Sequence, residues 1–171
     1  MFLNLILIVV ILFLFFLLSM FWPPDSPWAP WWRTNSKTAK AIFKLAKIKK
    51  GDMVYDLGSG DGTALLTGFK YFGIKGVGIE IDPLRYFISK VRVKISKAEK
   101  NILFERKNFF KTKIKEADLV VVYLVPVTLK KLLPKFKKEL KKGTKIVSYV
   151  YEMDLPLRAY DKKNKLRLYV I

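Results

Sequence analysis

The stretch "VYDLGSGDGTALL", residues 54–66, places three glycines within five residues, directly behind an apolar run. Glycine weakens helices and strands because it loses more conformational freedom on folding than any other residue. Such a cluster is tolerated where the backbone needs positive φ, or where another group approaches the backbone too closely for a side chain. The stretch therefore predicts a tight strand-to-helix turn with a ligand against its backbone.

Apolar runs alternate with stretches of helical periodicity throughout 36–171. Strands are predicted over 53–57, 76–82, 102–105, 117–125, 144–152 and 165–171, and helices over 39–46, 63–71, 83–95 and 128–140. Pro134 predicts a kink in the last helix or a later start for it. This alternation predicts an α/β fold, a doubly wound and mostly parallel sheet with helices on both faces.

In a sheet of this kind, ligands bind beyond the carboxyl ends of the strands, close to the first strand. Gly58, Gly60 and Gly62 fall on that first strand-to-helix turn. Glu80 ends the second predicted strand, 18 residues after Gly62, which is where an acid binds ribose hydroxyls. The spacing predicts a nucleotide site.

Two nucleotides are considered for this site, a dinucleotide and S-adenosylmethionine. The dinucleotide pattern G-x-G-x-x-G requires a glycine where Thr63 stands. Asp56 and Asp61 flank the turn, and carboxylates repel a pyrophosphate but attract the ammonium of a methionine group. The acidic turn therefore favours S-adenosylmethionine over NAD, and over a turn that binds nothing.

Composition narrows the chemistry further. The chain has no cysteine and no histidine, which excludes disulfides, thiolate nucleophiles, imidazole bases and nearly all zinc sites, and no metal is expected. Its 33 Lys and Arg against 14 Asp and Glu give a net charge of +19. This excess predicts a polyanionic partner, an anionic membrane surface or nucleic acid, with lysines used only for solubility as the alternative.

The first 22 residues are apolar except Asn4 and Ser19, and a helix of that length spans about 33 Å at ~1.5 Å per residue. No basic residue precedes the run and no small-x-small cleavage site follows, so a retained anchor is preferred over a cleaved signal peptide. We expect a transmembrane anchor at 1–22, a Pro- and Trp-rich linker at 23–35 and a globular domain at 36–171. All basic residues follow the run, which predicts a single-pass membrane protein with a cytosolic C-terminal domain.

Three segments carry a resemblance to a known family: "VYDLGSGDG", "GVGIEIDP" and "ERKNFF". They resemble motifs I, post-I and III of class I S-adenosylmethionine-dependent methyltransferases. More narrowly, residues 28–171 resemble the small archaeal broad-specificity protein lysine methyltransferases. They also resemble the mitochondrial relatives that methylate lysines of the ATP synthase c-subunit and the adenine nucleotide translocase. The stretch "LLPKFKKELKKGTKIVSYVYE" is more specific to this group than motif I.

The resemblance implies cofactor-binding roles. The methionine side of S-adenosylmethionine would be lined by Asp56, Gly58, Ser59, Gly60 and Asp61. Glu80 would bind the ribose, Ile81 would pack on the adenine, with core packing as its alternative, and Asn108 would reach the adenine edge, with a turn role as its alternative. The segment "WAPWWRT" stands where the family has a Pro-rich arm over the cofactor, but a Trp pair replaces a shorter polar stretch there.

Methyl transfer to an amine needs a neutral nucleophile aligned with the methyl carbon, and a free lysine is mostly charged at neutral pH. The candidate catalytic residues lie at the ends of the fourth and fifth predicted strands: Tyr123, Tyr151 and Glu152. The rings could form an aromatic wall and Glu152 could orient the ammonium. Burial as ordinary strand residues is the alternative.

The favoured function is methylation of protein lysines at or near a membrane. The segment "YLVPV" stands where amino-methylating DNA enzymes carry Asn/Asp-Pro-Pro-Tyr/Phe, and cytosine C5 chemistry would need a cysteine. The alternatives are a methyltransferase for RNA or for a small or lipid-like molecule, and a non-catalytic, membrane-tethered cofactor-binding domain.

Overall fold

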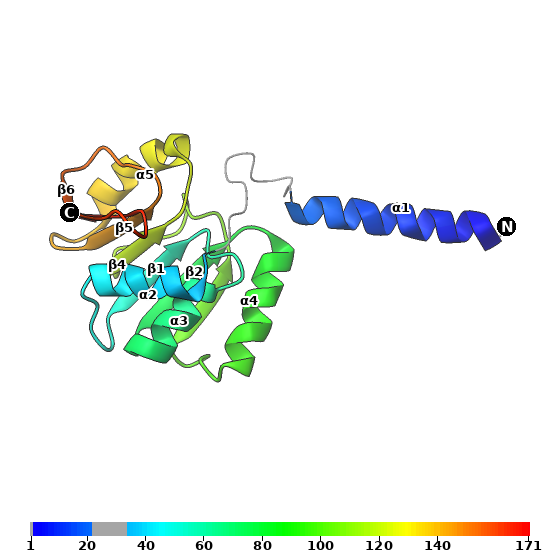
Figure 1. The fold of residues 1–171 in the computed structure, drawn as a ribbon, viewed down its shortest axis with the longest axis horizontal. Coiled ribbons are helices and arrows are strands. Elements are labelled where there is room, and N and C mark those ends of the chain that lie inside the picture. The colour runs from blue at the N-terminus through cyan, green and yellow to red at the C-terminus, as the bar shows by residue number, and fades with distance from the viewer. Residues whose placement is uncertain (1, 22–33) are drawn as a thin grey trace.

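The structure, a computed structural model, describes residues 2–21 and 34–171 (Figure 1). The predicted linker and the "WAPWWRT" segment lie almost wholly outside the described residues. The helices are α1 (Phe2–Phe21), α2 (Ser36–Leu45), α3 (Thr63–Phe72), α4 (Pro83–Ile95) and α5 (Pro126–Glu139). The strands are β1 (Met53–Leu57), β2 (Lys75–Glu80), β3 (Ile102–Arg106), β4 (Leu119–Val122), β5 (Lys145–Tyr149), β6 (Leu157–Asp161) and β7 (Leu166–Val170).

One seven-stranded sheet organises the domain, in the order β3-β2-β1-β4-β5-β7-β6. The first five strands in this order, β3, β2, β1, β4 and β5, pair in parallel. Strand β7 is antiparallel to both β5 and β6. A register shift between Leu157 and Ala159 interrupts the pairing of β6 with β7. The predicted α/β fold with a mostly parallel sheet is confirmed.

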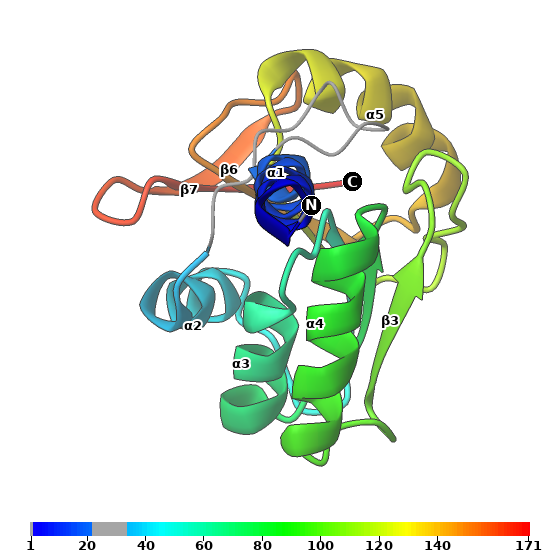
Figure 2. The same ribbon diagram turned by 90° about the vertical axis from the view of Figure 1, so that its right-hand side faces the viewer.

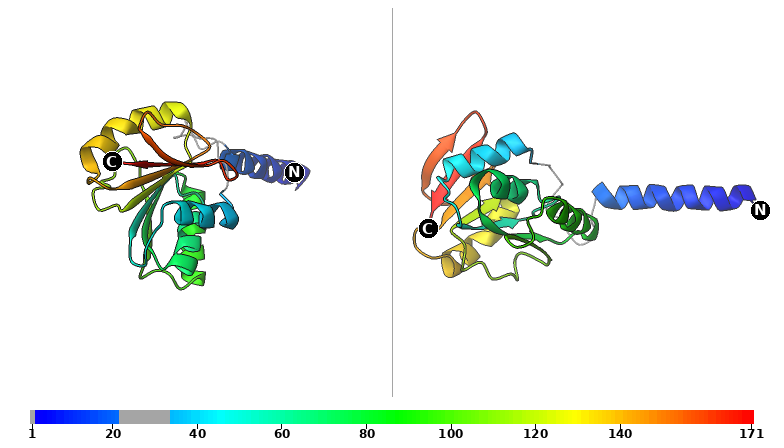
Figure 3. Two further views of the ribbon diagram at one scale, coloured as in Figure 1. Left: turned by 60° about the vertical axis from the view of Figure 1, so that its left-hand side comes forward. Right: turned by 90° about the horizontal axis from the view of Figure 1, so that it is seen from below.

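Helices cover both faces of this sheet, as predicted (Figures 2 and 3). Helices α2, α3 and α4 lie on one face, where Phe43, Leu65 and Val93 pack against β-strand residues in one core cluster. Helix α5 lies on the other face and contributes Leu129 and Phe136 to a second cluster. Apolar strand residues contribute to both clusters, as expected for a parallel sheet that is buried on two sides.

Local sequence signals explain the helix boundaries. The Asn35 side chain accepts a hydrogen bond from the Thr38 backbone at the start of α2, and Asp82 does the same for Arg85 at the start of α4. Helix α5 begins at Pro126, before the predicted start, so the later start expected from Pro134 is wrong. Pro126 occupies the first turn, where the missing N–H would have no partner in any case.

Two predicted strands, 117–125 and 144–152, extend furthest beyond the observed ones, and one strand was not predicted. Strand β4 ends at Val122. Strand β5 ends at Tyr149, because the next residue, Val150, adopts a positive φ of 70° that leaves the extended conformation. The strand that was not predicted is β6, whose five residues are all exposed or half-buried at the sheet edge, so its sequence lacks a clear apolar alternation.

The glycines of the β1–α3 turn do not all serve one purpose. A Cβ on Gly62 would come within 2.4 Å of Phe104 Cζ, and one on Gly78 within 2.4 Å of Phe104 Cδ1. These two glycines therefore make room for a buried ring of β3. Gly58 differs, because a Cβ there would meet only Leu124, at 3.5 Å.

Helix α1 carries no charged residue. Its side chains from Leu5 to Phe16 include large apolar groups that are 42–66 % exposed. Among the residues that the structure describes, however, no helix combines the length and apolarity needed to cross a membrane. The structure thus does not support the transmembrane span predicted at 1–22.

Candidate functional site

The turn from β1 to α3 is held against the neighbouring strand by its own backbone. The N–H groups of Gly58 and Ser59 both donate to the carbonyl oxygen of Ile79, at 2.9 and 3.0 Å. Gly58 has φ 83° and Gly60 has φ 54°, in the left-handed region that favours glycine. Gly58 is exposed while Gly60 is buried, so the turn presents bare backbone at the carboxyl edge of the sheet.

Glu80, at the end of β2, binds this turn directly. One carboxylate oxygen accepts the Gly60 N–H at 2.8 Å, and the other accepts the Asp82 N–H at 2.9 Å. The side chain is only 7 % exposed. Burial raises the pKa of Glu80 above its ordinary value, and the two backbone hydrogen bonds oppose that rise. Each oxygen has a second lone pair, so the carboxylate can still accept ribose hydroxyls, as the predicted role requires.

Asp56 is the second buried carboxylate of the site, at the penultimate position of β1. Burial, followed by the nearby charges of Glu80 and Asp61, raises its pKa to about 7. The group is thus poised between its protonated and charged forms at neutral pH. A cationic ligand next to it would favour the charged form.

Asp61 faces a different partner. Its Oδ2 lies 2.6 Å from the Arg92 guanidinium of α4, and its Oδ1 accepts hydrogen bonds from the backbone and hydroxyl of Thr63. Arg92 also donates to the Asp61 carbonyl and to the Thr63 hydroxyl. These contacts give Asp61 a role in closing the turn, and its predicted place beside the methionine group stays a prediction.

Ser59 carries the one buried side-chain polar atom without a hydrogen-bond partner among the described residues, its hydroxyl oxygen. Buried hydroxyls normally have a partner, and an orphan in a site indicates an absent ligand or water. The bare turn, the acid at the end of β2, the titratable Asp56 and this orphan hydroxyl fit a cationic nucleoside such as S-adenosylmethionine.

The two residues predicted at the adenine lie beside the same edge. Ile81 is half-buried directly after Glu80, and its carbonyl accepts a hydrogen bond from Arg106. Asn108 is exposed, and its Oδ1 accepts the Phe110 N–H at 2.9 Å. That bond forms a local turn, which supports the alternative role of Asn108.

The predicted catalytic residues divide into two groups. Tyr123 follows β4, and its ring centroid lies 4.4 Å from that of Tyr149 and 6.4 Å from that of Tyr151. Burial and the two neighbouring phenols raise the pKa of Tyr123 further above neutrality. Glu152 lies apart, 77 % exposed, where its Oε1 is 2.9 Å from Arg167. The structure brings the tyrosines together, adds Tyr149, which sequence analysis missed, and commits Glu152 to a cation.

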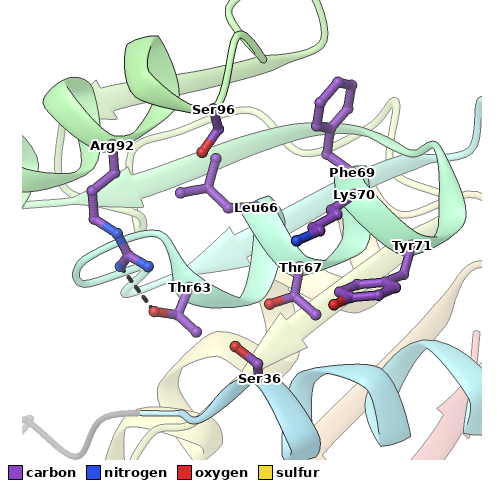
Figure 4. A pocket seen from close by; sticks show the side chains of 9 residues that line it. All are labelled: Ser36, Thr63, Leu66, Thr67, Phe69, Lys70, Tyr71, Arg92 and Ser96. Atoms are coloured by element: carbon purple, nitrogen blue, oxygen red, sulfur yellow. Dashed lines mark hydrogen bonds between the residues drawn. The ribbon is translucent and has the colours of Figure 1, made fainter.

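Apart from the cofactor turn, a hollow of about 600 Å³ lies on the outer face of α3, between α2 and α4 (Figure 4). Its lining includes the cations Lys70 and Arg92 and the hydroxyls of Thr63 and Thr67. None of the three helices, within their bounds, contains Asp or Glu. This hollow is separate from the turn, but Arg92 and Thr63 belong to both.

The mostly parallel sheet, with its acidic glycine turn, the buried acid at the end of β2 and the neighbouring tyrosines, is typical of an S-adenosylmethionine-dependent methyltransferase. The chain belongs to the family of the ANTKMT methyltransferase domain, whose model matches residues 56–156, more than half of the chain. The class and the family resemblance predicted from the sequence are confirmed.

Relatives agree with this assignment. The chain is 34% identical over 155 residues to a protein-lysine N-methyltransferase of Saccharolobus islandicus, covering 87% of this chain and 89% of that one. It is 26% identical to the adenine nucleotide translocase lysine N-methyltransferase of Mus musculus, where the match covers 70% of this chain and 52% of the relative. The chain thus spans about half the length of the Mus musculus protein.

A solved structure is also similar. An RNA methyltransferase from Salinibacter ruber, crystallised with S-adenosyl-L-homocysteine, superposes with a TM-score of 0.79 at 29% identity. The match covers 82% of this chain and 94% of that one.

Replacement of Glu80 by Gln tests the ribose site. We expect affinity for S-adenosylmethionine to fall by about tenfold or more, because hydrogen bonds to a charged acceptor contribute roughly 1.5–3 kcal/mol. Thermal stability should also fall, since Gln offers only one acceptor atom to the two backbone N–H groups. Calorimetry on the full chain measures the affinity, with the exposed Glu116→Gln as the control for charge. Unchanged affinity in Glu80→Gln would exclude the ribose role.

The raised pKa of Asp56 predicts a pH-dependent affinity. The protonated form predominates below pH 7, and cofactor cations favour the charged form, so the Kd should fall as pH rises from about 6 to 8. Binding at neutral pH should release a fraction of a proton. Calorimetry at several pH values, in buffers of different ionisation enthalpy, measures both the Kd and the number of protons released. Asp56→Asn should remove this dependence while the exposed Asp154→Asn keeps it; a pH-independent wild type would contradict the assignment.

Proposed function

We propose that the protein is a protein-lysine N-methyltransferase that acts on proteins at or near a membrane. The observation that carries this proposal is the juxtaposition of an acidic glycine turn with a cluster of three tyrosines at the same edge of the sheet. The archaeal relative, named a protein-lysine N-methyltransferase and matched over most of both chains, supports the substrate class.

When bound, the cofactor supplies a methyl group already activated on a sulfonium sulfur. The chain must then hold the lysine nitrogen in line with that methyl carbon and let the nitrogen lose a proton to solvent before the N–C bond forms. Tyr123 remains a neutral phenol at physiological pH, so its ring can pack on the lysine stem and its hydroxyl can hydrogen-bond the amine. Tyr151 completes the aromatic wall.

Glu152 fits the proposed chemistry less directly. Its carboxylate accepts two hydrogen bonds from Arg167, so the pair offers no net negative charge to the incoming ammonium. A slot without net negative charge favours the neutral, reactive amine over the ammonium. Glu152 therefore acts through Arg167 in this proposal.

RNA is the second candidate substrate. The similarity to the RNA methyltransferase from Salinibacter ruber and the net charge of +19 favour it. The tyrosine cluster favours lysine, because aromatic faces attract an arriving ammonium and pack against the apolar stem of the side chain. The two classes of substrate are separated by the label-transfer experiment below.

We further propose that the enzyme is bound to a membrane, with its domain on the cytosolic side. Helix α1 has no charged residue and exposes large apolar side chains from Leu5 to Phe16, and such a helix lies in water only at a large hydrophobic cost. Helices α2, α3 and α4 contain lysines and arginines but no Asp or Glu within their bounds, and such a layer complements the anionic lipids of a cytosolic leaflet.

Methyl transfer from tritiated S-adenosylmethionine identifies the substrate class. The full chain is incubated with membrane and soluble extracts, and labelled protein is hydrolysed to detect methyl-lysine. We expect label in membrane-associated protein, and much less label with the Glu80→Gln variant at a cofactor concentration near the wild-type Kd. Label that resists protease and is removed by ribonuclease would establish RNA instead.

Membrane binding is tested by washing. The full chain should remain with membranes in about 1 M NaCl, where a Debye length of ~3 Å screens surface electrostatics. Replacing Ile8 and Leu12 of α1 by Lys should release it, whereas the control that exchanges these two residues, Ile8→Leu with Leu12→Ile, should not. Release of the wild type by salt alone would show that α1 does not hold it.

A further inference from the structure

The backbone after β5 makes a strained turn directly beneath the tyrosine cluster. The Tyr151 N–H donates to the Tyr149 carbonyl at 2.9 Å, so the three residues 149–151 form a γ-turn. Its central residue, Val150, has φ 70°. A γ-turn of positive φ is the rarer, strained form, and a β-branched residue in this region is a true outlier. Strain of this kind persists only where surrounding contacts impose it.

Those contacts come from β7, from Lys165 directly before it, and from β5 itself. Arg167 donates through Nη1 to the Val150 carbonyl, and the Val150 N–H donates to the Lys165 carbonyl at 2.8 Å. The buried hydroxyl of Ser148 donates to the Tyr151 carbonyl at 2.6 Å. Ser148 and Arg167 are paired across β5 and β7, so one register position supplies both side chains that hold the turn.

Arg167 is itself fixed from two other sides. Its guanidinium bonds Glu152 through Nε and Nη2, at 3.2 and 2.9 Å, and lies over the Tyr160 ring at 4.5 Å from the centroid. Its side chain is only 13% exposed. A planar guanidinium can make these contacts at once, whereas a lysine ammonium cannot.

The turn determines where two of the three rings lie. It brings Tyr149 and Tyr151, on either side of Val150, within 4.4 and 6.4 Å of the Tyr123 ring. Leu124, next to Tyr123, is the side chain that would meet a Cβ on Gly58. Leu57 and Val122 are paired across β1 and β4, so the segment that carries Tyr123 passes beside the exposed Gly58 of the cofactor turn.

We propose that Arg167 is a positioning residue that holds the strained turn, and that Tyr149 forms the third wall of the slot for the substrate lysine. This inference rests on the proposed lysine methyltransferase function. The turn sets the spacing of the rings around the lysine stem, and Arg167 neutralises Glu152 so that the slot bears no net charge. Substrate alignment, not cofactor binding, depends on this device.

The experiment compares full-chain variants on the labelled substrate protein. Arg167→Met should lower kcat/KM for that protein about ten- to hundredfold, the loss expected from a small misalignment, with cofactor Kd unchanged within about twofold. Arg158→Met removes an exposed arginine of neighbouring β6 and should leave kcat/KM unchanged. An equal loss in both variants, or a matching loss of cofactor affinity in Arg167→Met, would overturn the proposal.

Relief of the backbone strain at Val150 distinguishes a positioning role of Arg167 from a role in protein stability alone. Glycine adopts positive φ without strain, so Val150→Gly should restore a large part of kcat/KM in the Arg167→Met background. No restoration would refute the role of the turn. Because Arg167→Met could fail to fold, variants of Tyr149 give an independent test. Tyr149→Phe should retain kcat/KM and Tyr149→Leu should lose it. Equal kcat/KM values in these two variants would refute the proposed role of the Tyr149 ring. A wild type that labels no lysine would instead refute the proposed function itself.

Discussion

The hydrogen bond from the Gly60 N–H to the Glu80 carboxylate is the interaction on which the site depends. It joins the first strand-to-helix turn to the end of the second strand, across 20 residues of chain. Because Glu80 is buried, its charge is tolerated only while the backbone N–H groups of Gly60 and Asp82 satisfy it. The bare turn is thus shaped by the same carboxylate that is predicted to bind the ribose.

Crowded carboxylates give this turn its chemical character. Asp56 and Glu80 are both buried, and Asp61 is close enough to raise the pKa of Asp56. A neutral or anionic ligand would leave this repulsion in place, whereas a sulfonium and an ammonium would relieve it. Arg92 of α4 relieves part of it already by binding Asp61. The repulsion among these three carboxylates is therefore lowered by Arg92 and by a bound cationic ligand.

Most of the fold and the cofactor turn could be predicted from the sequence, because their signals are local. Asn35 and Asp82 cap helices within three residues, and the glycine turn and Glu80 lie at the ends of short apolar runs. What was missed depends on contacts between distant segments. Arg92 and Asp61 are 31 residues apart in the chain. Nothing in the sequence near Tyr149 indicates that Arg167 of another strand binds the Val150 carbonyl directly after β5. Strand β6 was missed because an exposed edge strand has little hydrophobic alternation.

The register shift in the β6–β7 pair has a consequence for self-association. Strand β6 is one margin of the sheet, so its outer peptide groups could hydrogen-bond a second chain in a continuous ribbon. The irregularity at Leu157–Ala159 and the charged Arg158 within it break the flat row of donors and acceptors such a ribbon requires. A small defect in pairing at this margin disfavours the growth of fibrils from a domain that is otherwise built around one long sheet.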